Sequence, residues 1–336
     1  MRIEKMTANC TIAFFLAVLS VSACNSPAGP DVNPTPQGSL IAWFNGTGYT
    51  VDLYFPLSDS IVTGAYYTGN IPNDILSPGD GRIAVLNSFG CSVQVFDVDS
   101  TGGELFSIQL PDGSNPYQMS WDGEHLWVTL LLTAQVARLE LYPGGNVTLF
   151  DVDPNPTSIA SDGYSVFVGH GTWPDTSMSG GISVIDAASG SALGSIQTPD
   201  NVCFMRYFST SGRVHAMTTT YTGDGMISVI DPVAMQVTEE IETGGSPGFP
   251  SETPWGFVAG DGWSSGTLYF YRETGELDTW TTGLTSAAGV VCLGDTAYVT
   301  DPLTDRVFMA DCSARTLLDT LQAGTSGPQG ITSVQR

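Results

Sequence analysis

The chain has 336 residues, of which 34 are acidic and 10 are Lys or Arg, and its formal net charge is −24. So few cations exclude a nucleic-acid partner, because binding to phosphates requires clustered Lys and Arg. Lys5 is the single lysine, so Schiff-base chemistry and a P-loop phosphate site are excluded for the rest of the chain. The acidic balance favours solubility in salty surroundings or a cationic partner.

Residues 1–23 have the layout of a secretory signal peptide, since Arg2 and Lys5 precede a short apolar run and small residues. The run is too short to cross a bilayer. Residues 21–24 (VSAC) resemble a bacterial lipobox, so we expect cleavage before Cys24 and lipidation of its thiol. An ordinary signal-peptidase site before an incidental Cys24 is the alternative. The N-terminus therefore predicts an exported lipoprotein of the bacterial cell envelope.

Residues 24–38 follow as the lipidated cysteine and a tether that contains four prolines and no apolar periodicity. The folded body is predicted over residues 39–336. Because no later apolar stretch approaches membrane length, we expect membrane attachment through the N-terminal lipid alone. We expect the body to be a monomer.

The folded body repeats one phrase: a turn residue, an apolar strand, Asp-Gly or a similar pair, a second apolar strand, a loop, and a third strand that ends on Asp. Intervals of 40 to 45 residues separate the units, which is the spacing of four-stranded propeller blades and not of helical solenoids. The units open near Pro72, Pro116, Pro156, Asn201, Ser246, Ala287 and Pro328.

The two ends of the body complement one another. Residues 328–334 match a first strand without its successors, whereas residues 39–69 supply three strands without a first one. Pairing them would close the ring and remove its sheet edges. The sequence therefore predicts an all-β, seven-bladed β-propeller of four-stranded antiparallel blades, closed by pairing of the N- and C-terminal strands.

The last full unit reads AYVTD at 297–301 and VFMAD at 307–311, and PQGI follows at 328–331. This unit resembles the YVTN-type β-propeller repeat, and the ISVID segments at 182–186 and 227–231 match the same template. Other units depart from it, with Leu130, His170 and Thr218 where the repeat prefers Asn. The resemblance implies the fold and does not transfer an activity.

Catalytic signatures such as GxSxG, HExxH and the P-loop do not occur in the sequence. His125, His170 and His215 fall in three blades without the spacing of metal ligands, and we expect His125 and His215 to be packed or surface residues. The aspartates that close third strands could act in catalysis, but one at a fixed place in each blade is typical of an Asx turn. These are Asp97, Asp186, Asp231 and Asp311.

Four cysteines remain beyond Cys24, and an even number in an oxidising compartment makes two disulfides the default. Cys292 and Cys312 are the pair within one predicted blade. A strand separates them, which places them about 9.6 Å apart and beyond disulfide reach. We therefore predict no disulfide.

Two long loops, at residues 169–181 and 244–255, combine tryptophan with acidic residues and are predicted on one rim of the ring. Aromatic rings beside carboxylates suit a protein, peptide or carbohydrate partner, with charge favouring a cationic one. The alternative is that the aromatics only anchor variable loops. The predicted binding residues are His170, Trp173, Asp175, Asp224, Phe249, Glu252, Trp255, Asp261, Trp263 and Asp301.

Oxygen-bearing residues also precede or open the first strands, where the channel mouth is expected, and such ligands suit Ca²⁺ or Mg²⁺. The candidates are Asp74, Asn115, Asn155 and Asp200, with Asn73 and Asn201 beside them. Ordinary turn chemistry is the alternative reading of these residues.

The sequence leaves two functions open. The first is a non-enzymatic binding or scaffolding propeller, which needs no cofactor, and the second is a metal-assisted lactonase or lyase at the channel.

Overall fold

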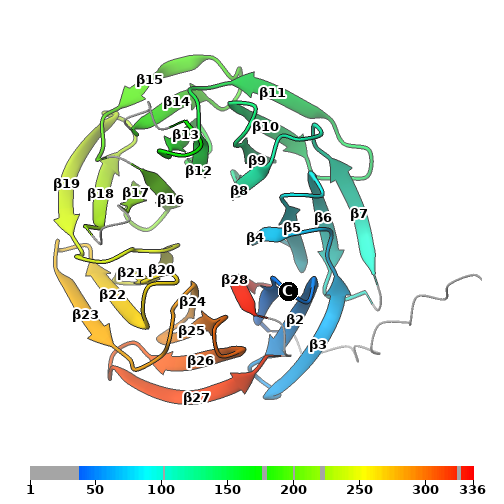
Figure 1. Cartoon of the computed structure of the whole chain (residues 1–336), viewed down its shortest axis with the longest axis vertical. Coiled ribbons are helices and arrows are strands. Elements are labelled where there is room, and N and C mark those ends of the chain that lie inside the picture. The colour runs from blue at the N-terminus through cyan, green and yellow to red at the C-terminus, as the bar shows by residue number, and fades with distance from the viewer. Residues whose placement is uncertain (1–37, 101–102, 176–179, 200, 220–223, 324–326) are drawn as a thin grey trace, which may run out of the picture.

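The computed structural model describes residues 38–336 except 101–102, 176–179, 200, 220–223 and 324–326. The predicted signal peptide, the lipidation site Cys24 and the tether lie outside the described residues, apart from Gly38. The body is a ring of seven antiparallel sheets around a central channel (Figure 1). The described residues contain no helix that is long and apolar enough to cross a membrane.

Each blade has four strands, numbered here from the channel outward. Blade 1 contains β28 (Pro328–Val334), β1 (Leu40–Asn45), β2 (Thr50–Phe55) and β3 (Ser60–Tyr67); blade 2 contains β4 (Pro72–Gly79), β5 (Arg82–Asn87), β6 (Ser92–Asp97) and β7 (Glu104–Gln109). Blade 3 contains β8 (Pro116–Trp121), β9 (His125–Leu130), β10 (Gln135–Glu140) and β11 (Val147–Asp151); blade 4 contains β12 (Pro156–Ser161), β13 (Ser165–His170), β14 (Ile182–Asp186) and β15 (Ala192–Ile196). Blade 5 contains β16 (Val202–Phe208), β17 (Arg213–Thr218), β18 (Met226–Asp231) and β19 (Gln236–Glu242). Blade 6 contains β20 (Ser251–Thr253), β21 (Gly256–Gly260), β22 (Thr267–Arg272) and β23 (Leu277–Thr281); blade 7 contains β24 (Gly289–Leu293), β25 (Thr296–Asp301), β26 (Arg306–Asp311) and β27 (Thr316–Gln322).

The ring closes as predicted, by pairing of the C-terminal strand β28 with β1. The antiparallel register joins Leu40 to Val334 and Trp43 to Ile331, and in Figure 1 the red C-terminal strand lies inside the blue N-terminal strands. Closure removes the two sheet edges that an open ring would present. The prediction of seven four-stranded blades is confirmed.

The core lies between neighbouring blades. The second strands are almost wholly buried because each face of the sheet is covered by the next blade, which explains near-continuous apolar runs such as LIAWFN in β1 and HLWVTL in β9. One cluster joins Leu53 of blade 1 to Val85 and Phe96 of blade 2. Tyr66 stacks on Phe96 with ring centroids 4.8 Å apart.

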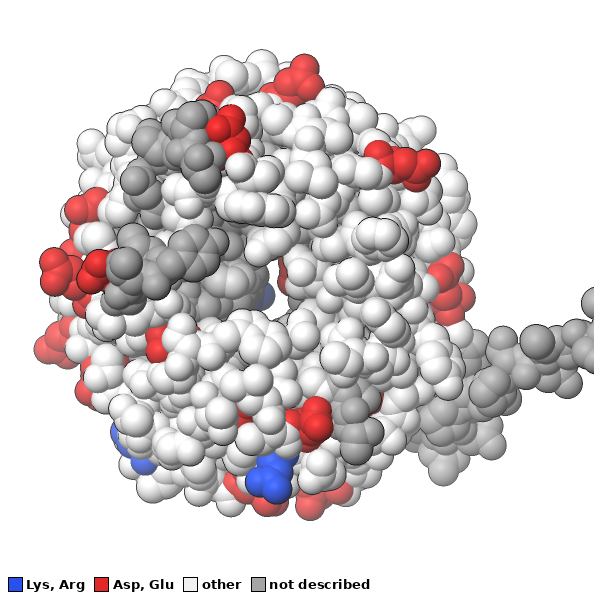
Figure 2. Space-filling model, in the orientation of Figure 1, with Lys and Arg blue, Asp and Glu red and all other residues white. Residues whose placement is uncertain are grey.

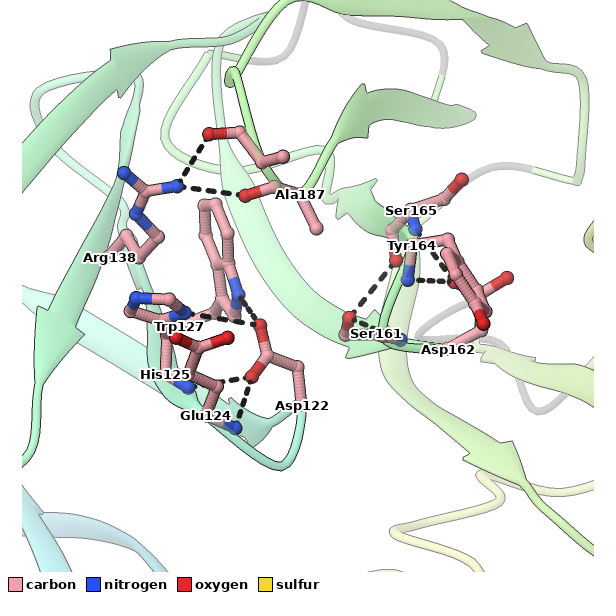
Figure 3. A network of polar contacts seen from close by, with 12 residues as sticks. Asp122, Glu124, His125, Trp127, Arg138, Ser161, Asp162, Tyr164, Ser165 and Ala187 are labelled. Carbon is pink, nitrogen blue, oxygen red and sulfur yellow. Dashed lines mark hydrogen bonds and ion pairs between the residues drawn. The ribbon is translucent and has the colours of Figure 1, made fainter.

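Aspartates at the turns between first and second strands organise these hairpins. Asp122 Oδ1 accepts the backbone N–H groups of Glu124 and His125 at 2.8 and 2.6 Å, and Oδ2 accepts the indole N–H of Trp127 at 2.7 Å (Figure 3). Asp162 accepts two backbone N–H groups in the same way in blade 4. The turn glycines that follow, Gly123 and Gly163, have φ of 102° and 88°, which explains the Asp-Gly pairs.

The aspartates at the ends of third strands form Asx turns, as predicted. Asp97 Oδ1 accepts the N–H of residue 99, and Asp186, Asp231 and Asp311 each accept an N–H three residues on, at 2.6 to 2.9 Å. Hydrogen bonds from Ser189 lower the pKa of Asp186. These carboxylates therefore stabilise turns on the outer part of blades 2, 4, 5 and 7.

Blade 6 departs from the predicted phase. Its inner strand begins at Ser251 and not near Ser246, and it is only three residues long. Pro247, Pro250 and Pro254 surround it, and proline lacks the N–H needed to extend a ladder. The segment before Ser251 is therefore a connection, and residues 254–255 form the next hairpin turn.

Cys292 and Cys312 lie close enough in blade 7 for the Cys312 thiol to raise the pKa of Cys292, together with burial. Cys312 lies just beyond the end of β26, where its N–H bonds the carbonyl of Asp295 in the β24–β25 turn at 2.9 Å. Both thiols are unbridged in the structure.

Candidate functional site

Four of the predicted binding residues are exposed on loops of three consecutive blades. Trp173 and Asp175 lie in the β13–β14 loop, Asp224 in the β17–β18 loop and Trp263 in the β21–β22 loop. The tryptophans are 57% and 56% exposed. Second-to-third strand loops all lie at the same end of antiparallel blades, so these four residues, called here the loop rim, occupy one face.

His170 does not belong to the loop rim, although it was predicted there. It is buried at the end of β13, where its ring nitrogens bond the Pro154 carbonyl at 2.9 Å and the Ser183 hydroxyl at 2.8 Å. Burial lowers its pKa. The ring therefore holds the start of the β13–β14 loop against its neighbours.

Asp261 and Asp301 are likewise buried and bonded within the protein. Asp261 accepts the backbone N–H of Ser246 at 2.6 Å and the Tyr269 hydroxyl at 2.7 Å. Asp301 accepts the Ser286 hydroxyl at 2.7 Å. The prediction that these carboxylates face a partner is wrong, because each anchors the connection that enters its blade.

Trp255 lies at the opposite end of the ring from the loop rim. It occupies the β20–β21 turn and stacks on Phe270, with centroids 6.3 Å apart. The shift of the inner strand to Ser251 causes this displacement. Glu252 and Phe249 line the central channel, as Trp263 of the loop rim also does.

Two of the predicted metal ligands at the channel mouth, Asn115 and Asn155, occupy turn positions before inner strands. Asn115 and Asn155 directly precede β8 and β12 with φ of 49° and 59°, a left-handed conformation that asparagine tolerates. Asn155 is buried, and its side chain bonds the backbone of Gly171 and Asp175. Asp200 lies outside the described residues. Among the described residues no group of three or more His, Cys, Asp or Glu could hold a metal ion.

The channel itself contains a cavity of about 610 Å³ lined by the inner strands. Asp74 faces it from β4, and its two oxygens accept the N–H groups of Ile75 at 2.8 Å and Met119 at 2.7 Å. Burial raises the pKa of Asp74 to about 7. Asp74 thus links blade 2 to blade 3.

Arg206 of β16 is a channel residue that the sequence analysis did not single out. Its Nη1 donates to the Pro250 carbonyl at 3.3 Å, and its guanidinium carbon lies 5.3 Å from the centroid of the Phe249 ring. A weak signal was present, since Arg206 is the single charged residue in the first strand of blade 5.

The fold and the open channel place the chain among the β-propellers. No family model matches it, and no curated protein matches its sequence. One similar solved structure is hydrazine synthase from Kuenenia stuttgartiensis, with a TM-score of 0.65 and 15% identity over 78% of this chain and 89% of that one. Another is apo AztD from Citrobacter koseri, with a TM-score of 0.65 and 11% identity over 89% of this chain and 98% of that one. A streptogramin B lyase is also similar, with a TM-score of 0.62 and 14% identity over 78% of this chain and 86% of that one. At such identities the likeness supports the fold alone.

Proposed function

We propose that this protein is a non-enzymatic binding propeller, exported and held at the membrane by lipid on Cys24, which engages its partner through the loop rim. The exposure of Trp173 and Trp263 on the same face is the observation that carries the proposal. The repeat is proposed to be of the YVTN type, supported by the AYVTD and ISVID segments.

The chemistry of the loop rim favours a peptide or protein partner with basic side chains. Exposed indoles offer rigid contact area and accept cation–π contacts from Lys or Arg. Asp175 and Asp224 are also exposed on the loop rim, and carboxylates suit charge-assisted hydrogen bonds with basic side chains. The acidic residues scattered over the face in Figure 2 would attract such a partner over distance.

Binding to arrays of immobilised peptides and glycans tests this proposal with defined probes. The variants Trp173→Ala and Trp263→Ala should each weaken binding to an Arg-rich peptide by about tenfold or more, as expected for tryptophans at the centre of an interface. Tyr164→Ala is the matched control, because Tyr164 is 83% exposed in the β12–β13 turn at the opposite end of the ring.

Equal binding by wild type and both tryptophan variants would contradict the assignment of the loop rim. Binding to neutral glycans in place of basic peptides, lost in the same variants, would keep the loop rim and change the class of partner to carbohydrate.

A further inference from the structure

The central cavity contains a cation whose hydrogen-bonding capacity is largely unused. Among the described residues that line the cavity, Arg206 is the only Lys or Arg. A guanidinium has five N–H donors, and the structure pairs one of them, on Nη1, with the Pro250 carbonyl. Within the described part of the chain, no carboxylate lies within 4.0 Å of this guanidinium.

The carboxylates that share the cavity are bonded to other donors. Glu252 Oε1 accepts the N–H of Thr210 at 3.0 Å and its hydroxyl at 2.5 Å. Both oxygens of Asp74 accept backbone N–H groups. These acids offset part of the charge of Arg206 from a distance, and they leave its donors available to a ligand.

Aromatic rings hold the guanidinium and provide an apolar wall. Phe249 lies against Arg206, and the edge of Phe204 meets Phe249 with centroids 6.0 Å apart. Tyr207 and Trp263 also line the cavity. A volume of about 610 Å³ is within the range of pockets for small organic ligands. Figure 2 shows the channel open to solvent, with basic and acidic atoms visible inside it.

We propose that the central channel binds a small organic carboxylate with a flat apolar body, its carboxylate on Arg206 and its body beside Phe249. A planar guanidinium matches a carboxylate with two parallel hydrogen bonds. Arg206 supplies one positive charge, which matches the charge of a monoanion and not that of a doubly charged phosphate. This site is separate from the loop rim apart from Trp263, so either proposal can fail without the other.

Calorimetric titration of the full chain with benzoate tests the proposal, with benzamide as its neutral analogue and inorganic phosphate as the competing anion. Benzoate should bind at least about tenfold more tightly than benzamide or phosphate, since hydrogen bonds between charged groups are stronger than those of neutral ones. Arg206→Gln should remove this preference, and Phe249→Leu should weaken benzoate binding several-fold.

Arg138→Gln is the matched control. Arg138 also lies over aromatic rings, those of Trp127 and Phe150, but it does not line the cavity. Three results would overturn the proposal: benzoate binding that is unchanged in Arg206→Gln, benzoate binding that is lost equally in Arg138→Gln, and no detectable binding at about 10 mM benzoate. Tighter binding of phosphate than of benzoate would overturn the assignment of the ligand as a carboxylate. If Arg206→Gln does not fold, the benzoate-to-benzamide ratio and Phe249→Leu decide.

Discussion

His215 is buried on β17 among three aromatic rings, and neither of its ring nitrogens has a hydrogen-bond partner. The rings of Phe208, Phe257 and Tyr271 lie 4.7, 5.1 and 5.7 Å from its centroid. Burial, with a smaller contribution from Arg213, lowers the pKa of His215 from 6.5 to about 3. The folded protein therefore keeps this imidazole neutral at a pH where the unfolded chain protonates it.

The sign of the pH effect follows from this difference. As pH falls through 6.5, the unfolded state takes up a proton that the folded state does not, so stability decreases and levels off only below about pH 3. With these values, His215 alone should lower the free energy of unfolding by about 2 kcal/mol between pH 8 and pH 5. The variant His215→Leu should lose this part of the pH dependence.

Urea unfolding of the wild type and His215→Leu across this pH range measures the difference. Met217→Leu is the control, because Met217 is a buried residue of the same strand and cluster that does not titrate. The wild type and Met217→Leu should lose stability more steeply than His215→Leu. If all three lose stability in parallel, His215 is not held neutral by burial and the reasoning fails.

Two further predictions concern stability. Deleting residues 328–336 should lower the melting temperature by more than about 5 °C, because it removes the partner of β1 and exposes Leu40 and Trp43; unchanged melting would refute the role of β28 in closure. Trp255→Ala should lower the free energy of unfolding, measured in urea, by about 2 kcal/mol because it removes the stacking on Phe270. Trp173→Ala should leave this free energy nearly unchanged, since Trp173 is exposed. A larger loss in Trp173→Ala than in Trp255→Ala would refute the placement of Trp255 in the β20–β21 turn.

The fold was predictable because its information is local and repeated. Each unit carries Asp-Gly turns and β-branched strands, and the surplus strand at the C-terminus indicates how the ring closes. The error in blade 6 arose where prolines replace the usual first strand, since a turn residue such as Ser246 marks a loop without fixing where hydrogen bonding begins.

The candidate site was less predictable because sequence assigns a residue to a loop but does not show where its side chain points. Asp261, Asp301 and His170 are in or beside loops, yet they turn inward to bond backbone and hydroxyl groups. The channel was missed for a related reason. Arg206 belongs to blade 5 and Phe249 to the connection that enters blade 6. Their contact in the channel depends on the three-dimensional arrangement of the strands, which the sequence does not show.

The pairing of β28 with β1 also determines when the ring can form during synthesis. β1 can pair with β28 only after residues 328–334 have been synthesised. The contact that completes blade 1 therefore has a very large sequence separation, and closure of the ring is expected to be a late, slow step. Until then β1 has an open edge that another chain could pair with. A chain shortened before Pro328 keeps that edge permanently, which makes incomplete products prone to aggregation and exposed to proteases.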